Sequence, residues 1–178
     1  GWEGGHRVPF IARWPGRIAK EQVSDQMTNT TDIFATLASV VGYTLPNDAA
    51  TDSFDMLPAM IGTQDPKKSI RPHLLTQSFR GEFQIRQGHW KYLDHQGSGG
   101  NKYDKDPMKK YALPEMSPEA SGQLYNLATD PGETKNLFFK EEAKRKELQA
   151  LLLQLKESGR SAPKNRKPVG IRNIPHVK

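Results

Sequence analysis

The stretch FQIRQGHWKYLDH, residues 83–95, has the alternation of a β-hairpin and decides how the second half of the chain folds. Apolar side chains recur at every second position on both sides of Gln87-Gly88, namely Phe83, Ile85, Trp90 and Tyr92. Glycine suits such a turn because its backbone reaches positive φ at little steric cost. The pattern therefore predicts two antiparallel strands that share one aromatic face.

The segments after the hairpin supply a further strand and a long helix. The sequence LYNL at 124–127 is typical of a short strand, and the turn Asp130-Pro131-Gly132 follows it. A leucine stripe then predicts a helix over 140–158 that ends at Gly159, with its apolar positions at Leu148, Leu151, Leu152 and Leu155. The pattern therefore predicts a small sheet that is covered by this helix. Residues 96–118, which lack periodicity, are expected to form a long surface loop.

Before the hairpin, the pattern changes from strand-like to helical. Residues 7–14, RVPFIARW, read as a buried strand closed by Pro15-Gly16. A helix is predicted over 31–41, capped by Thr30 or Thr31 and ended by Gly42; its apolar face holds Ile33, Phe34, Leu37, Val40 and Val41. A second short helix is predicted from Asp55 to Gly62. The fold class is α+β, with a change of subdomain between about 62 and 72.

The composition leaves room for one domain with a real core. The chain has 178 residues, of which 35% are hydrophobic, and it contains 15 Gly and 13 Pro. Such a chain is rich in loops, so we expect part of its stabilising contacts to lie outside it. No apolar run approaches the ~18 residues that a membrane span needs, and we expect none.

The net charge of +6 is confined to the end of the chain. Residues 160–178 hold six basic residues and no acidic one, so residues 1–159 are balanced. A basic extended tail is therefore predicted over 161–178, and the balanced body gives no reason to expect nucleic acid.

Cysteine is absent from the sequence. Disulfides, thiolate metal sites and cysteine nucleophiles are thereby excluded within these residues. The compartment stays open, because any signal sequence would precede Gly1.

Few residues form constellations that favour catalysis or metal binding. The five histidines are scattered, at positions 6, 73, 89, 95 and 176, and none has the spacing of a metal-binding pair. The glycine-rich pieces GWEGGH and GSGGN lack the spacing of a phosphate-binding loop. We interpret GSGG as a flexible loop tip.

Residues 1–10, GWEGGHRVPF, are the strongest candidate for a site. Gly4-Gly5 allows close backbone approach, and His6 and Arg7 present donors at the predicted mouth of a strand, where an anion could bind. A packing turn in which Arg7 pairs with Glu3 or another acidic group is an equally good interpretation.

Five segments, taken together and in order, resemble the carboxy-terminal part of a type I sulfatase of the arylsulfatase A or N-acetylgalactosamine-6-sulfatase group. They are WEGGHRVPFIARWPGRI, SDQMTNTTDIFATLASVVG, DSFDMLPAMIG, FQIRQGHWKY and QLYNLATDPGETKNL. The resemblance covers about residues 1–160.

The resemblance implies the end of an alkaline-phosphatase-like α/β sulfatase domain over 1–65, followed by a small C-terminal subdomain over 66–160. In this arrangement 8–13 would be one of the last strands of the large sheet. The 31–41 helix would cover that sheet, and the small antiparallel sheet with its long helix would form the subdomain.

The resemblance also implies hydrolysis of sulfate esters in sulfated carbohydrates or aryl sulfates. A formylglycine made from the Cys or Ser of a C/S-x-P-x-R motif attacks sulfur, and a calcium ion balances the charge. The nearest string here, SAPKN at 161–165, lacks the Arg. We expect the nucleophile, the metal ligands and a catalytic Lys to precede Gly1, in a missing N-terminal domain. The fragment alone would then be inactive.

The residues expected near substrate are His6, Arg7, Gln77 and Ser78, of which the last two follow from the resemblance. Export to the periplasm or outside the cell is also implied. The alternative function is a non-catalytic module that binds sulfated polysaccharide or nucleic acid through the basic tail.

Overall fold

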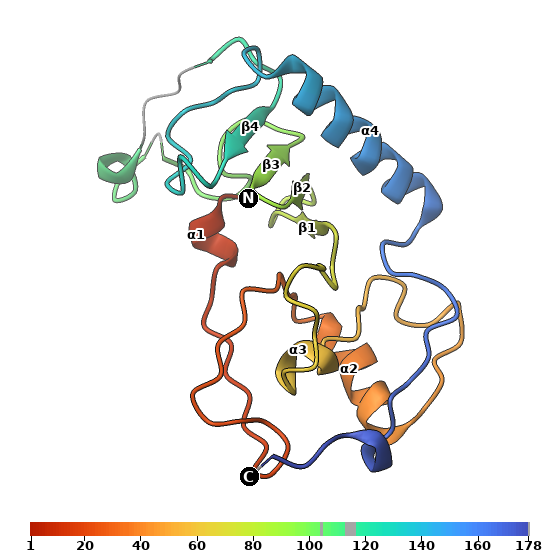
Figure 1. Cartoon of the computed structure of the whole chain (residues 1–178). Coiled ribbons are helices and arrows are strands. Elements are labelled where there is room, and N and C mark those ends of the chain that lie inside the picture. Colours follow the sequence, from red (N-terminus) through yellow and green to blue (C-terminus); the bar gives the residue numbers. More distant parts are fainter. Residues whose placement is uncertain (104, 113–116, 178) are drawn as a thin grey trace. The chain divides into compact units, whose positions relative to one another are not determined.

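The computed structural model describes residues 1–103, 105–112 and 117–177, and its contacts divide the chain into two compact units (Figure 1). Unit 1 contains Gly1–Pro9 and Leu75–Glu157, and unit 2 contains Phe10–Leu74 and Ser158–Lys178. Each unit is thus assembled from two separate stretches of sequence, whereas the expected divisions at 65/66 and 160/161 are sequential. None of the described helices is long and apolar enough to cross a bilayer.

A four-stranded sheet in the order β1-β2-β3-β4 forms the centre of unit 1. Its strands are β1 (Leu74–Gln77), β2 (Phe83–Gln87), β3 (Trp90–Leu93) and β4 (Gln123–Asn126). Strand β3 pairs antiparallel with both β2 and β4, so the predicted hairpin and the LYNL strand are confirmed as neighbours. The turn lies one position later than predicted, over residues 88–89, and Gly88 has a φ of 57°.

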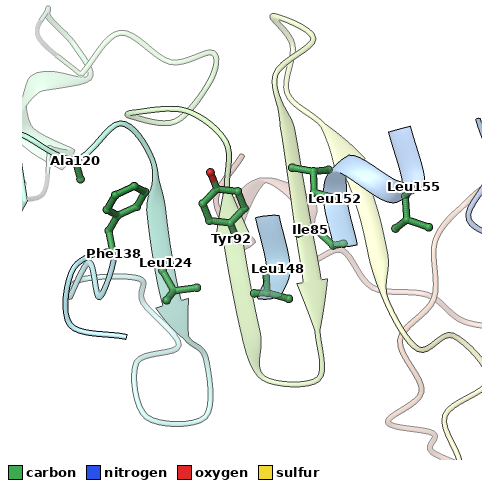
Figure 2. Packing of buried hydrophobic residues seen from close by; sticks show 8 residues of the cluster. All are labelled: Ile85, Tyr92, Ala120, Leu124, Phe138, Leu148, Leu152 and Leu155. Atoms are coloured by element: carbon green, nitrogen blue, oxygen red, sulfur yellow. The ribbon is translucent and has the colours of Figure 1, made fainter. Parts of the chain in front are cut away.

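One face of the sheet packs against the long helix α4 (Glu142–Ser158). The strand residues Ile85, Tyr92 and Leu124 are cross-strand neighbours, and all are buried. The buried cluster adds Ala120, Phe138, Leu148, Leu152 and Leu155 (Figure 2). The predicted combination of a small antiparallel sheet and a leucine-striped helix is confirmed, because alternation in the strands and the 3.6-residue period of the helix place apolar side chains on facing surfaces.

The opposite face of the sheet buries polar side chains next to Leu93 and Tyr125. Gln84, Lys91 and Gln123 occupy the positions that alternate with the apolar ones, and each is at most 2% exposed. Groups of this kind are stable inside a protein only when they find partners. Some of the partners come from residues 1–6, which contain the short helix α1 (Glu3–His6), and others come from Glu133 and from backbone carbonyls of the loop after β3.

Unit 2 is built around helix α2 (Asp32–Val41) and the single turn α3 (Leu57–Met60). The left-handed conformation of Gly42, with φ 77°, ends α2 as predicted. The predicted threonine cap is wrong, because Thr31 makes no capping hydrogen bond through its side chain. Instead, the Asn29 amide oxygen accepts from the Thr31 backbone N–H at 3.0 Å.

Helix α2 buries its polar side and exposes its apolar side. Asp32, Ala35, Thr36 and Ser39 are buried. The predicted apolar face stands largely in solvent, with exposed fractions of 42% for Ile33, 60% for Phe34, 58% for Leu37 and 73% for Val41. A helix normally turns such a stripe towards a core, so α2 presents an apolar surface that the described residues leave uncovered.

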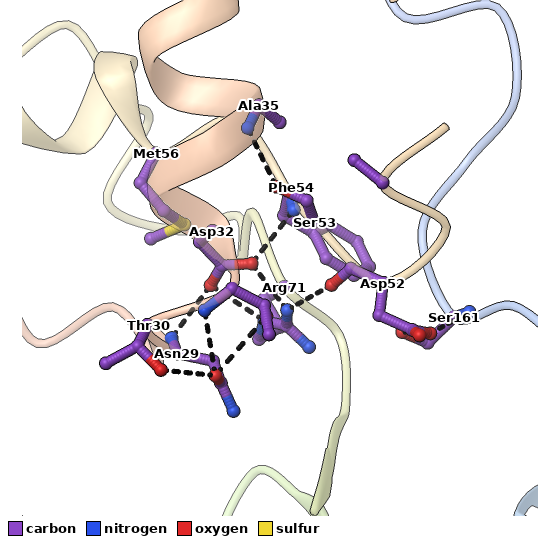
Figure 3. Close-up of polar contacts among 12 residues, drawn as sticks. Asn29, Thr30, Asp32, Ala35, Asp52, Ser53, Phe54, Met56, Arg71 and Ser161 are labelled. Carbon is purple, nitrogen blue, oxygen red and sulfur yellow. Dashed lines mark hydrogen bonds and ion pairs between the residues drawn. The ribbon is translucent and has the colours of Figure 1, made fainter. Parts of the chain in front are cut away.

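A buried ion pair ties α2 to Arg71, which lies three residues before β1 (Figure 3). Arg71 Nη2 lies 2.5 Å from Asp32 Oδ1, and Arg71 Nε lies 3.1 Å from Oδ2. The carboxylate also accepts from the backbone N–H groups of Phe54 at 2.9 Å and Asn29 at 2.8 Å. The guanidinium lies over the Phe54 ring, 4.4 Å from its centre. The pair is saturated with hydrogen bonds, which is the condition under which a buried charge pair is tolerated.

The strand predicted within residues 7–14 does not form. Residues 7–13 are exposed and have no strand assignment; Ile11 is 89% exposed. A strand needs a neighbour to pair its backbone N–H and C=O groups, and the described residues provide none here. Apolar composition alone therefore does not make this segment a strand.

The C-terminal segment is packed against the rest of unit 2 instead of extending into solvent. Apart from the 3₁₀ turn η2 (Ile171–Asn173) it lacks regular structure, yet Ala162 and Ile174 are buried. Arg160 donates to the Asn47 carbonyl at 2.6 Å, and Arg166 donates to the Ala49 carbonyl at 2.6 Å. Backbone carbonyls that face these guanidinium groups explain why a basic segment is held against the unit.

Candidate functional site

The charged residues of α1 are paired with the polar face of the sheet. Glu3 Oε2 lies 2.9 Å from Arg86 Nη1, and Glu3 Oε1 lies 3.2 Å from Lys91 Nζ. Glu3 thus pairs with these two side chains and not with Arg7. The predicted turn around Gly4-Gly5 is a single helical turn. The ion pairs of Glu3 hold this turn against the sheet.

Glu133 completes this charged cluster from the turn after β4. Its Oε1 lies 3.0 Å from Lys91 Nζ, and its Oε2 accepts from the Glu3 backbone N–H at 2.6 Å. Lys91 is almost fully buried, so its charge depends on the two carboxylates around it. Glu133 adopts a φ of 54°, which costs a residue with a Cβ about 1–3 kcal/mol and is more often found at functional sites.

Trp2 is fixed by a hydrogen bond from its indole nitrogen. Trp2 Nε1 donates to Gln123 Oε1 at 3.0 Å, while the Gln123 amide nitrogen donates to the carbonyls of His95 at 3.0 Å and Gly97 at 2.8 Å. Strand β4 thereby holds both the indole ring and the loop that begins after β3.

His6 contacts the sheet through one ring nitrogen. Its Nε2 lies 2.8 Å from the Gln84 amide nitrogen. The tautomer of the imidazole decides which of these two groups donates the hydrogen bond. Burial lowers the pKa of His6 below its ordinary value, the charge of Lys91 lowers it further, and Glu3 opposes the shift.

A pocket of about 740 Å³ opens between α1, the end of β1, the loop after β3 and the turn after β4. Three of the four predicted site residues line it, namely His6, Gln77 and Ser78. Arg7 is exposed and lies outside the lining. The pocket therefore brings together residues that are more than seventy positions apart in the sequence.

Ser78 lies in a chain of polar contacts that does not suit nucleophilic catalysis. Its hydroxyl donates to Glu82 Oε2 at 3.2 Å, and the same carboxylate oxygen lies 3.6 Å from His95 Nδ1. A serine nucleophile needs a base such as histidine in contact with its hydroxyl. Here the Ser78 hydroxyl contacts the Glu82 carboxylate, and the histidine lies beyond that carboxylate.

The sequence matches the family described as "N-sulphoglucosamine sulphohydrolase, C-terminal" over residues 2–159, which include every residue on the polar face of the sheet and all of the pocket lining except Gly1. The chain belongs to this sulfatase family. The segments that carried the sulfatase resemblance lie within the match, and that prediction is confirmed.

Curated relatives of this sulfatase chain agree with the family. It is 30% identical to an N-acetylgalactosamine-6-O-sulfatase of Bacteroides thetaiotaomicron over 87% of its length, and 35% identical to human arylsulfatase A over 76%. The chain spans 28% and 27% of those two relatives, about a quarter of their length.

A solved sulfatase structure shares the fold. It comes from work on the metabolism of multiple glycosaminoglycans by Bacteroides thetaiotaomicron, and it matches with a TM-score of 0.52 and 28% identity. The match covers 71% of this chain and 24% of the other.

Several residues of the pocket were not predicted from the sequence. The most informative are Trp2, Asn101, Tyr103, Tyr111 and Glu133. GSGG was interpreted as a free loop tip, yet Ser98, Gly99 and Gly100 form part of the wall. The Asp130-Pro131-Gly132 turn was the one available signal, since it predicted a tight reversal just before Glu133.

The described residues contain no group of three or more His, Cys, Asp or Glu that could hold a metal ion. Within them, the carboxylates nearest the pocket are engaged by Lys91 and by backbone N–H groups. The calcium implied by the sulfatase resemblance does not fit these side chains.

Proposed function

We propose that this chain is the C-terminal portion of a sulfatase that hydrolyses sulfate esters of glycans or aryl alcohols, and that the pocket is one wall of its substrate site. The observation that supports this is the convergence of His6, Gln77 and Ser78 on one pocket within the segment that matches the family. In this role, the neutral His6 offers an N–H to an anionic ester, and Gln77 and Ser78 offer uncharged hydrogen bonds.

The catalytic step is proposed to need residues outside this chain. Formylglycine and calcium would come from an N-terminal domain, and the chain alone would be inactive. The uncovered apolar side chains of α2 support such a partner, since monomeric proteins rarely leave a large apolar patch in water. Export to the periplasm or beyond the cell belongs to the same proposal.

Reading and expressing the coding sequence together with the region upstream of Gly1 tests this function. We expect an in-frame C/S-x-P-x-R motif and calcium-dependent release of sulfate from 4-nitrophenyl sulfate or a sulfated glycan by the longer protein. The purified 178-residue chain should release none. Turnover by the chain itself would contradict its inactivity, and a longer protein without that motif would contradict the assignment.

The alternative, a polyanion-binding module that uses the C-terminal basic residues, finds less support. The side chains of Arg160 and Arg166 already donate to backbone carbonyls of unit 2. Fewer free cationic donors are then left for a polysaccharide or nucleic acid than the sequence alone suggested.

A further inference from the structure

The last residues of the chain lie beyond the family match and still belong to the interior of unit 2. The match ends at residue 159, whereas Ser158–Lys178 is the second stretch of sequence in that unit. Ile174 is only 2% exposed and packs against Leu57. The strap, residues 160–177, runs beside the C-terminal end of α2, where Figure 1 shows it in blue.

The guanidinium of Arg166 binds several backbone carbonyls of one loop in unit 2. Its Nη1 donates to the carbonyls of Ala50 at 2.8 Å and Ser53 at 3.0 Å. Its Nη2 donates to the carbonyls of Ala49 at 2.6 Å and Pro46 at 3.4 Å. An arginine can satisfy several carbonyls at once because its donors form a rigid planar fork, whereas a lysine ammonium is a single point charge. These four carbonyls form a cradle for a guanidinium group.

The loop that carries the cradle makes further contacts with the strap. The Asn165 backbone N–H donates to Asn47 Oδ1 at 2.7 Å, and Asn47 Nδ2 donates to Asn165 Oδ1 at 3.0 Å. The Ser161 hydroxyl donates to Asp52 Oδ1 at 2.7 Å (Figure 3). Ala50 in the same loop has a φ of 47°, a conformation that a residue with a Cβ keeps only where its surroundings enforce it. The strap therefore contacts side chains and carbonyls of this loop in the way a docked peptide does.

The strap also supplies hydrogen-bond partners to the polar side of α2. The Val169 N–H donates to Ser39 Oγ at 3.0 Å, and the Gly170 N–H donates to the Ser39 carbonyl at 2.8 Å. A Cβ built on Gly42 would lie 3.4 Å from Gly170 Cα, so the two segments touch. Ser39 is 3% exposed, and a buried hydroxyl is tolerated only when it has a partner. Because the polar side of α2 is paired in this way, its apolar side, which includes Leu37, stays exposed.

We propose that the cradle and Ser39 form a peptide-docking surface, that its occupant is the strap of the same chain, and that Arg166 is the residue this surface recognises. The docked strap fixes which side of α2 is buried and which side is presented to a partner. This device lies outside the segment that matches the family. The strap acts in this way whatever domain covers α2, and only the identity of that domain rests on the proposed function.

A second copy of the chain is the other possible source of the strap, by exchange of C-terminal segments. The strap follows Gly159 directly, and its first residues are already bound. Arg160 donates to the Asn47 carbonyl at 2.6 Å, and the Ser161 N–H donates to Asp52 Oδ1 at 2.8 Å. Little free length is then left to reach another copy, which favours docking within one chain.

Hydrogen exchange of the 178-residue chain, followed by mass spectrometry, tests the inference with a matched pair of variants. Arg166→Gln should accelerate exchange in the strap and in α2 by about tenfold, because it removes the charged donor of the cradle. Arg172→Gln makes the same change of charge at an exposed position of the strap and should leave both unchanged. Strands β3 and β4 are the internal reference and should keep their exchange rates in both variants.

Two further measurements separate recognition of the guanidinium from charge and from exchange between copies. Arg166→Lys, the milder variant, keeps the charge but loses the fork, so it should also accelerate exchange in the strap. Sedimentation velocity should find a monomer over about a hundredfold range of protein concentration, with the same strap protection throughout.

Each other outcome overturns the inference. Equal exchange in Arg166→Gln and Arg172→Gln, or full protection in Arg166→Lys, would show that the guanidinium is not recognised. A faster strap with an unchanged α2 would show that the strap does not hold the helix. A dimer that loses strap protection on dilution would assign the occupant to a second copy. None of these measurements uses sulfatase activity, so failure of the proposed function would leave their outcome unaffected.

Discussion

At the scale of single residues, Gly99 shows how closely two segments approach at the pocket. A Cβ built there would lie 2.5 Å from Ser78 Cβ, and the residue has a φ of 70°. Gly97 has a similar φ of 65° but open space around its Cβ position. Both glycines therefore need a positive φ, but only Gly99 also lacks room for a Cβ.

We expect Gly99→Ala to destabilise the chain more than Gly97→Ala. The positive φ costs each alanine about 1 kcal/mol, and the contact with Ser78 adds about 1–3 kcal/mol at position 99 or forces the loop away from the pocket. Urea denaturation of both variants measures the difference. Equal denaturation midpoints would show that the loop yields freely and that the close approach is not required.

Two half-buried histidines, His6 and His73, make the stability depend on pH. Burial lowers the pKa of His6, and burial likewise lowers the pKa of His73, below the ordinary value of about 6.5. The unfolded chain therefore binds these protons first as pH falls below that value, and the stabilisation present above it is lost. We expect the urea midpoint to fall between about pH 7.5 and about pH 5.5. The His6→Gln and His73→Gln double variant should lose less over that interval, and an equal loss would assign the effect to other groups.

At the scale of elements, the sheet and α4 depend on the leucines that face each other. Leu148 is fully buried, whereas Leu153 on the same helix is 56% exposed. We expect Leu148→Ala to cost about 2–5 kcal/mol and Leu153→Ala less than about 0.5 kcal/mol. Thermal and urea denaturation measure both. A small effect at Leu148 would mean that α4 is not needed to cover the sheet.

The same elements show what periodicity can predict. Residues 83–95 have a period of two, and α4 has a period of 3.6 residues. Both periods predicted the observed structures, because the sheet and the helix that pack against each other lie within the chain. The apolar run at 8–13 failed as a strand, since strand formation depends on a pairing neighbour that the residues themselves do not specify. For α2, the apolar pattern predicted the helix correctly but did not predict which face of the helix is buried. Asp32 and Ser39 are inside because Arg71, Phe54 and Val169 supply partners for them.

The pocket was predictable only in part for a related reason. His6, Gln77 and Ser78 lie in segments with recognisable patterns, but Trp2 and Tyr103 became neighbours through the fold. Trp2 is held by Gln123, and Glu3 is held by Arg86 and Lys91; these are contacts between distant residues with no local pattern. Long-range polar pairing is therefore the main information that the sequence did not reveal.

At the scale of the whole molecule, the two units have different kinds of interior. Among its described residues, unit 1 has one contiguous cluster of buried apolar side chains that joins three strands to α4. Unit 2 has two smaller clusters, and one of its helices turns apolar side chains to solvent. Amide groups are protected from exchange when their opening disrupts many buried contacts.

We therefore expect slower amide hydrogen exchange in β3, β4 and α4 than in α2. Mass spectrometry of the 178-residue chain would follow both units in one experiment, and Leu148→Ala provides a control that should accelerate exchange in unit 1. If an additional domain covers Ile33, Phe34, Leu37 and Val41, the longer protein should protect α2 to the level of β3. Equally slow exchange of both units in the isolated chain would instead show that unit 2 needs no partner, and the proposed role of its exposed apolar side chains would be wrong.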